Sequence, residues 1–332
     1  APPFLLGGSL LKHTIKRIFT SILLFFIVSS IVFTLIRLQP GNPFASMVTV
    51  DTDPELMERK MIEYGLYDPI PIQYIKWLGR IICGDMGYSI QYKVSVSSLI
   101  KSRMMNSILL CGSVFLLTLI FACLLGVYSA KKPNGLLDRV MTILSFTSVS
   151  IPSFFIALLL IKLFSFDFQF LPPSGIVTAG SKASGINRIL DILYHMILPV
   201  GILTLVQTSH CIRYVRASMI DVLHQDYIHA VQTKGIGENR ILWIHGFRNA
   251  LPTVINLFSM QLPNLISGTV LTETVFVWPG IGRLSYESIL SHDYPVTMGV
   301  TLIISFMVIV SNLFADILSH YLDPRQRRGG RK

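Results

Sequence analysis

Residues 107–130 read SILLCGSVFLLTLIFACLLGVYSA, a stretch without a charged side chain. A helix that crosses the hydrocarbon core of a bilayer needs about 20 predominantly apolar residues. A helix also satisfies its own backbone hydrogen bonds, which lipid cannot do. We therefore predict that this stretch is a transmembrane helix.

Stretches of the same character occur along the rest of the chain. They cover residues 18–36, 140–161, 192–212, 251–272 and 295–315. The ionisable side chains within them are His195 and His210 of the fourth span. Taken with residues 107–130, they predict an all-α integral membrane protein with six transmembrane helices.

The composition supports a membrane protein and argues against a soluble one. Hydrophobic residues make up 52% of the chain and charged residues 14%, whereas soluble domains carry about 25% charged residues. The net charge is +10, but the basic residues lie in short segments between apolar stretches, as in membrane-flanking loops. We expect no nucleic-acid partner. The cysteines and histidines form no cluster with metal-ligand spacing, so no metal site is expected.

The positions of lysine and arginine predict the orientation. If both termini lie in the cytosol, the two short outside loops contain four basic residues, Lys162, Lys182, Arg188 and Arg283. The inside segments then contain Lys12, Lys16, Arg17, Lys131, Lys132, Arg139, Arg213, Arg216, Lys234, Arg240, Arg248, Arg325, Arg327, Arg328, Arg331 and Lys332. This asymmetry follows the positive-inside rule.

The predicted boundaries follow from the spans and the orientation. They are a cytosolic N-terminal segment at 1–17, a first span at 18–36, an extracytoplasmic segment at 37–106, a core of five spans at 107–320 with a cytosolic loop at 213–250, and a cytosolic basic tail at 321–332.

The extracytoplasmic segment contains two stretches in which apolar residues recur at helical spacing. They lie at 54–64 and 71–82, and in the second the apolar positions are Ile72, Ile75, Leu78 and Ile82. We predict two short amphipathic helices. Packing onto the membrane helices and contact with a solute are both possible roles, and packing is favoured.

The cytosolic loop contains signals for one short helix. Asp226 is placed to cap a run over 227–234, and Gly235 follows at the point where a left-handed residue would end the helix. Such a helix would expose Tyr227, Ala230, Val231 and Lys234. It could insert into a groove of a partner protein, or it could simply connect two spans.

Several motifs in this chain resemble one transporter family. The loop sequences DYIHAVQTKGI (226–236) and HGFRNALP (245–252) are similar to the EAA loop of ABC-importer permeases. The stretches FLPPSG (170–175), ETVFVWPGIGRLSYESI (273–289) and LDPRQRR (322–328) resemble the oligopeptide, dipeptide and nickel permease branch. The chain departs from the broad pattern at His229, which replaces a glutamate, and at Val231, which replaces an alanine.

The resemblance implies a type I ABC-importer permease fold in the bacterial cytoplasmic membrane. It implies that the loop helix is a coupling helix that sits in a groove of an ATPase subunit. The residues of this ATPase-coupling site would be Asp226, Tyr227, Ala230, Val231, Thr233, Lys234 and Gly235.

The same resemblance implies partners and excludes a catalytic role for this chain. The partners would be membrane lipid, a second homologous permease, two cytosolic ABC ATPases and an extracytoplasmic solute-binding protein. No GxxxxGK[ST] motif occurs in the sequence, so ATP and magnesium would bind to the ATPases, and this chain would bind no cofactor. The solute would be a short peptide, nickel or a metal–chelator complex.

Polar residues within the spans are candidates for the translocation pathway, because polar groups in a membrane are costly and often functional. In the fifth span Gln261, Asn264, Gly268 and Thr272 share one helical face, and Glu273 follows them. Gln207 of the fourth span is a further candidate. These residues could line a pore or could hydrogen-bond to neighbouring helices.

Two other functions are compatible with a polytopic chain. A secondary transporter driven by an ion gradient would be expected to show repeated halves and midplane carboxylates, which we do not find in this sequence. An intramembrane enzyme would need a catalytic motif such as HExxH or GxSxG, and none occurs.

Overall fold

The computed structural model describes residues 4–38, 62 and 67–322. Within them the secondary structure is helical, apart from a single β-bridge between Tyr88 and Ser95. The elements are α1 (Phe4–Leu38), α3 (Ile70–Ile82), α4 (Val96–Lys131), α5 (Leu136–Ser150), α6 (Ser153–Ile161), the π-helical turn η2 (Lys162–Asp167), α7 (Ile186–Leu223), α8 (Asp226–Gln232), α9 (Glu238–Arg240), the π-helical turn η3 (Ile241–Phe247), α10 (Arg248–Val275), α11 (Ile281–Leu290) and α12 (Tyr294–Leu322).

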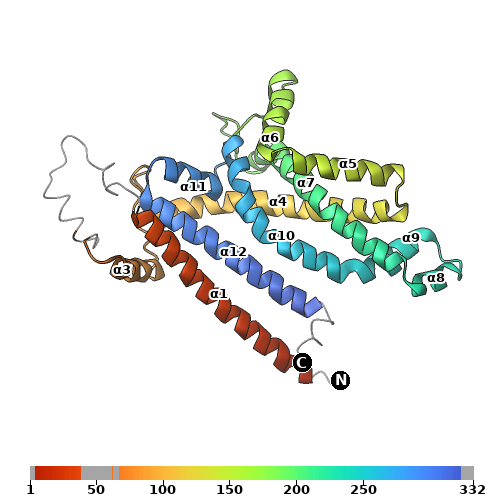
Figure 1. Ribbon diagram of the computed structural model, residues 1–332. Helices are drawn as coiled ribbons and strands as arrows, with labels where there is room; N and C mark the ends of the chain where they lie inside the picture. The colour runs from red at the N-terminus through yellow and green to blue at the C-terminus, as the bar shows by residue number, and fades with distance from the viewer. Residues whose placement is uncertain (1–3, 39–61, 63–66, 323–332) are drawn as a thin grey trace.

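Among the described residues, five helices are long and apolar enough to cross a bilayer. They are Thr14–Leu38 of α1, α4, α7, the continuous run Glu238–Val275 that includes α10, and Tyr294–Leu318 of α12. Neighbouring spans contact one another in the order α4, α7, α10, α12, α1 (Figure 1). The predicted all-α membrane fold is therefore confirmed.

The predicted span at 140–161 is not a continuous helix. The segments Leu136–Ser148 and Ser153–Asp167 meet at an angle of 101°, and α6 turns away from α5 in Figure 1. Ile151 has an extended backbone, with φ −99° and ψ 128°, because the ring of Pro152 disfavours a helical conformation in the residue before it. Six spans are present only if this bent pair counts as one.

Several helices extend beyond the apolar stretches that predicted them. α1 begins at Phe4, so residues 4–17 continue the first span, and α4 begins at Val96 within the predicted segment 37–106. α7 contains 38 residues, which corresponds to about 57 Å and exceeds the ~30 Å hydrocarbon core. Hydropathy detects only the lipid-embedded part of a helix, which explains these differences.

The predicted amphipathic helix at 71–82 is present as α3, but it packs through another face. Trp77 contacts Phe33 of α1 with 5.2 Å between ring centroids, and Tyr74 lies beside the same ring. Ile75 and Ile82, by contrast, are exposed. Aromatic contacts with α1 set the orientation of α3, so the face expected from the aliphatic spacing is wrong. Apart from Ile62, the predicted helix at 54–64 lies outside the described residues.

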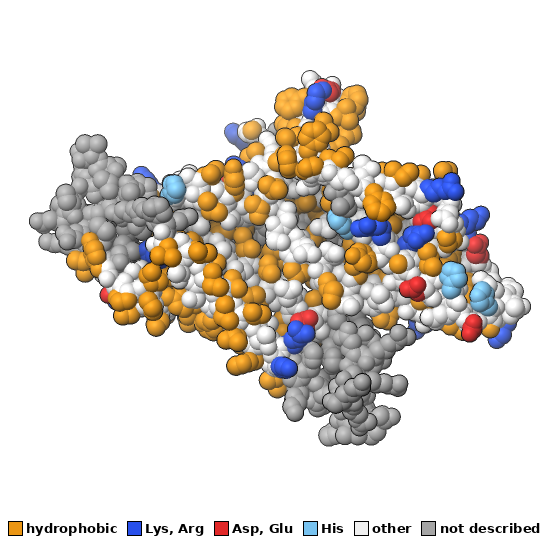
Figure 2. Space-filling model, viewed as in Figure 1, with side chains coloured by type: hydrophobic (Ala, Val, Ile, Leu, Met, Phe, Trp, Pro, Cys, Tyr) orange, Lys and Arg blue, Asp and Glu red, His pale blue; other side chains and the backbone are white. Residues whose placement is uncertain are grey.

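The molecule has two chemically different ends along the direction of the spans. Charged side chains and histidines, many of the former Lys and Arg, gather at the end of the molecule that carries α8 and α9, whereas hydrophobic side chains cover much of the remaining surface on the same face (Figure 2). α11 lies at the opposite end (Figure 1). We refer to these as the α8 end and the α11 end.

Candidate functional site

Helix α8 is a two-turn helix between the long helices α7 and α10, as the sequence predicts. It ends at Gln232, and Gly235 follows with φ +74°, a left-handed conformation that glycine adopts at little cost. The predicted cap is wrong in detail, however. Gln225 is the N-cap residue with an extended backbone, and Asp226 lies in the first turn.

One face of α8 is fixed to the turn that begins the next span. Ile228 is completely buried. The hydroxyl of Tyr227 donates a hydrogen bond to the carbonyl of His245 at 3.2 Å. The amide of Asn249 donates to the Tyr227 hydroxyl at 2.8 Å and to the His245 carbonyl at 2.7 Å. These contacts join α8 to η3 and to the start of α10.

The opposite face of α8 is open. The predicted coupling residues Asp226, Tyr227, Ala230, Thr233, Lys234 and Gly235 are exposed, whereas Val231 is half-buried. A Cβ atom built on Gly235 would meet no other atom within 4 Å. The predicted residues therefore lie together on one small projection, α8 and the residues up to Gly235, but Val231 exposes less surface there than expected.

Beneath α8 lies a close-packed cluster of four helical segments. The buried residues of α4, α7, η3 and α10 in this cluster are Ala122, Val127, Ala130, Cys211, Ile212, Val215, Met219, Val222, Leu242, Ala250, Val254 and Phe258. At its centre Gly246 of η3 lies so close to α7 that an added Cβ would be 3.0 Å from Cε of Met219. Interiors of this density transmit displacement rather than absorb it. A force on α8 should reach α7 and α10.

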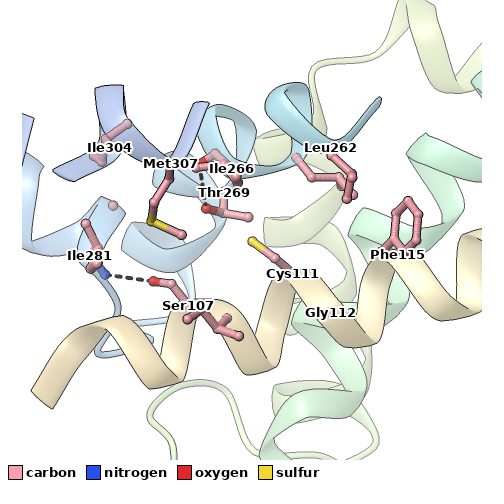
Figure 3. Close-up of a pocket in the computed structure, with 13 residues that line it drawn as sticks. Ser107, Cys111, Gly112, Phe115, Leu262, Ile266, Thr269, Ile281, Ile304 and Met307 are labelled. Carbon is pink, nitrogen blue, oxygen red and sulfur yellow. Dashed lines mark hydrogen bonds between the residues drawn. The ribbon is translucent and has the colours of Figure 1, made fainter. Parts of the chain in front are cut away.

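A second buried polar site lies at the α11 end. Glu273 is fully buried, and its carboxylate accepts hydrogen bonds from the Ser107 hydroxyl at 2.7 Å and from the Arg283 backbone N–H at 3.0 Å. The Ser107 hydroxyl also accepts a 2.8 Å bond from the backbone N–H of Ile281, drawn in Figure 3. A carboxylate is favourable at this position because the first turn of α11 presents unpaired N–H groups.

The predicted pathway residues on α10 differ in their exposure. Asn264 and Gly268 are exposed, Gln261 is half-buried, and Thr272 is buried. Gln207 of α7 is also half-buried. α11 folds back over the last turn of α10, which encloses Thr272 and Glu273. In this conformation Glu273 holds α11 in place and does not face a solute.

An apolar pocket of about 210 Å³ lies beside the Glu273 site, between α4, α10, α11 and α12 (Figure 3). Its polar groups are the hydroxyls of Ser107 and Thr269 and the thiol of Cys111, and the remaining lining residues are apolar or glycine. This lining suits side chains or acyl chains better than a polar solute.

Two contacts with buried carboxylates were not predicted from the sequence. They are the Ser107–Glu273 hydrogen bond and an ion pair between the buried Asp138 of α5 and the partly exposed Arg216 of α7. Their partners lie 166 and 78 residues apart, so no local spacing connects them. For the Glu273 contact, the sequence signal was the pair of glycines at 280 and 282. A Cβ atom at either position would collide with the Glu273 carboxylate.

Comparison with known proteins shows similarity to one family of membrane transport components. Residues 122–328 match the family model described as "Binding-protein-dependent transport system inner membrane component", and residues 10–111 match the model of the N-terminal part of the same kind of component. The chain is 38% identical to the oligopeptide transport system permease protein AppB of Bacillus subtilis, over 94% of this chain and 98% of the relative.

Two further relatives are similar over almost their whole length. A putative peptide permease protein of Brucella suis is 32% identical over 95% of this chain and 99% of its own. The metal-staphylopine import system permease protein CntB of Staphylococcus aureus is 33% identical over 96% of this chain and 99% of its own.

We predict that Glu273→Ala destabilises the α11 end. The substitution leaves the Ser107 hydroxyl and the first N–H groups of α11 without their acceptor, and each buried unsatisfied group costs about 1–3 kcal/mol. The purified chain should therefore show a lower thermal midpoint. The control is Thr274→Val, because the Thr274 hydroxyl bonds only to the carbonyl of Val270 in its own helix at 2.8 Å. Equal midpoints for the two variants would contradict this role of Glu273.

Proposed function

We propose that α8 is the helix through which an ATPase drives transport, since this chain belongs to the family of binding-protein-dependent transport system inner membrane components. The chain is an inner-membrane permease subunit of an ATP-driven importer of the ABC type. The observation that carries the proposal is the construction of α8, which is fixed through Ile228 and Tyr227 and open around Ala230 and Gly235.

The proposed orientation places the α8 end in the cytosol and the α11 end outside. The gathering of basic side chains near α8 supports it, since cytoplasmic loops are enriched in lysine and arginine. An ion pair of 3.0 Å between Arg17 of α1 and Asp316 of α12 ties together the beginning of the first span and the end of the last one. With both of these segments on the α8 side, the two termini lie in the cytosol.

The proposed assembly contains a second homologous permease, two cytosolic ATPases that bind ATP and magnesium, and an extracytoplasmic solute-binding protein. The surface of α10 supports the need for a second permease. Asn264, Ser267 and Gly268 are exposed in the middle of a predicted span, where polar groups are expensive in lipid. We assign this exposed face to the translocation pathway, half of which this chain would form.

The proposed mechanism uses the fixed position of α8. ATP binding closes the two ATPases, and their grooves carry the two coupling helices with them. Because α8 is joined to η3, and η3 to α7, the displacement reaches the spans as a rigid-body motion. The pathway then alternates between inward- and outward-open states. Family membership favours this mechanism over a secondary transporter driven by an ion gradient.

We propose short peptides as the transported solute. The names of the Bacillus and Brucella relatives refer to oligopeptide or peptide transport, and that of the Staphylococcus relative refers to metal-staphylopine import. Two of these three names support peptides, and a metal–chelator complex or nickel is the second candidate. The cytosolic tail at 321–332 predicted from the sequence is retained as a part of this proposal.

Gly235→Arg should uncouple ATP hydrolysis from uptake without preventing membrane insertion. Position 235 is exposed with open space around it, so an arginine would intrude into the ATPase contact rather than into this chain. Loss of a central contact costs about 2 kcal/mol, which corresponds to roughly 30-fold weaker binding. Uptake and ATP hydrolysis are measured in vesicles with equal amounts of inserted protein.

The control for this variant is Gly235→Asn. Asparagine tolerates the left-handed backbone of position 235 but adds a short side chain, so it should retain most of the coupled activity. Undiminished transport by a well-expressed Gly235→Arg protein would contradict the proposed role of α8.

A deletion strain tests the solute separately. Loss of this chain should abolish ATP-dependent uptake of radiolabelled di- to pentapeptides and leave uptake of nickel and of metal–chelator complexes unchanged. Restoration of peptide uptake by the wild-type chain is the control. If only the metal or the complex fails to enter, the peptide assignment is wrong, while the role of α8 is unaffected.

A further inference from the structure

An ion pair with a buried carboxylate connects the start of α5 to α7. Arg216 donates two hydrogen bonds to the Asp138 carboxylate, from Nε to Oδ1 at 2.5 Å and from Nη2 to Oδ2 at 2.7 Å. The carboxylate also accepts bonds from the Ser129 hydroxyl at 2.7 Å and from the backbone N–H of Asn134 at 2.8 Å. The Asp138 side chain is only 4% exposed. The pair is therefore oriented by its surroundings as well as by its own charges.

The ion pair lies next to the coupling site. Arg216 is in the last part of α7, the helix that leads into α8. On the other side of α8, Glu238 of α9 forms an ion pair of 2.9 Å with Lys131, the last residue of α4. The junction of α4 and α5, from Lys131 at the end of α4 to Asp138 in the first turn of α5, is thus bound to the chain both before and after α8.

These two ion pairs differ in burial and should differ in strength. Glu238 is 63% exposed, and exposed pairs contribute little because water screens them. Arg216 is 29% exposed, but the Asp138 carboxylate is 4% exposed and accepts four hydrogen bonds, so loss of Arg216 would leave a buried carboxylate without its counter-charge. The Asp138–Arg216 contact is therefore the stronger of the two.

Helix α5 is attached to α7 mainly through polar and charged side chains. Its buried side chains, among the described residues, are Asp138, Ser145 and Ser148. Ser148 accepts a hydrogen bond of 3.0 Å from Ser209 of α7, and Arg213 of α7 lies over the Phe146 ring at 5.5 Å. Met141 also packs against the hydrophobic cluster of α4 and α7. α5 therefore keeps contact with the bundle without the ion pair, which is its strongest polar link to α7.

Helix α7, in contrast, does not need the ion pair to remain in position. A Cβ atom added to Gly126 of α4 would be 2.8 Å from Cβ of Val215, which shows how closely the two helices approach. Loss of the pair should leave α7 on α4 and α5 against the bundle, but α5 should no longer follow the motion of α7. This difference distinguishes a transmitting contact from one that only stabilises the fold.

We propose that the Asp138–Arg216 pair is a second transmission contact, which makes α5 follow α7 when α8 is displaced. The inference rests on the proposed function of α8. Asp138 and Arg216 are positioning residues that touch neither solute nor nucleotide. α5, and with it the bent segment α6, then moves as part of the coupling unit.

The test measures distances between spin labels in the complete importer reconstituted in nanodiscs, with native cysteines replaced. Labels are placed at Gln232 of α8, Ile143 of α5 and Val310 of α12, all of which are exposed. Gln232 is not one of the predicted coupling residues. The distances 232–310 and 143–310 are compared without nucleotide and with ATP plus vanadate. In the wild type both distances should change, by about 2–5 Å.

In Asp138→Asn the 232–310 distance should still change, whereas the 143–310 distance should no longer respond to nucleotide. The control is Arg139→Gln, which removes a charge from the neighbouring exposed position and should behave as the wild type. Asp138→Glu keeps the charge and should restore part of the response.

The outcomes separate the two proposals. An unchanged 232–310 distance in the wild type would contradict the proposed function of α8. A 143–310 response that persists in Asp138→Asn would overturn only the present inference. A wild type in which only the 232–310 distance responds would overturn it as well. A nucleotide-free 143–310 distance that already differs between Asp138→Asn and the wild type would show that the pair has a purely structural role.

Discussion

The attachment of α8 to η3 is the constraint on which the rest of the structure depends. A helix of seven residues is too short to be stable alone in water. Burial of Ile228 and the hydrogen bonds that join Tyr227 to His245 and Asn249 hold it in one place. Without them a partner would only bend the loop. With them a displacement of α8 must also displace η3 and the spans that η3 contacts.

Two buried carboxylates organise the opposite ends of the helix bundle. Glu273 fastens α11 to α4 through Ser107, and Asp138 fastens α5 to α7 through Arg216. Each carboxylate is surrounded by donors, as burial of a charge requires. In a membrane, helices associate through close packing and through interhelical hydrogen bonds, because lipid is as apolar as the helix faces. Here close packing joins α7 to α4, whereas polar contacts fasten α11 and α5.

The sequence was sufficient for features that depend on local physical chemistry. An apolar stretch such as 107–130 identifies a span without reference to the rest of the chain, and Gly235 marks the end of a short helix because of its backbone freedom. The break at Ile151 was also local, since Pro152 follows it. Hydropathy alone concealed this signal, because both sides of the break are apolar.

Features that depend on tertiary contacts could not be predicted in the same way. The buried face of α3 is determined by Phe33 on a distant helix, and the enclosure of Thr272 by the folding back of α11. Asp138 and Arg216 are ordinary membrane-flanking charges until the fold brings them together. The predicted coupling residues lie together because they occupy α8 and the three residues that follow it, whereas the environment of the predicted pathway residues depends on several elements.

Site-specific photocrosslinking in the assembled importer tests the central claim most directly. A benzophenone amino acid is placed at Ala230 on the open face of α8, and in a second variant at Ile75 on α3, which is exposed near the opposite end. Our account predicts that irradiation joins the ATPase subunit to position 230 and not to position 75. An ATPase crosslink from position 75, or a crosslink from position 230 to the solute-binding protein, would contradict it.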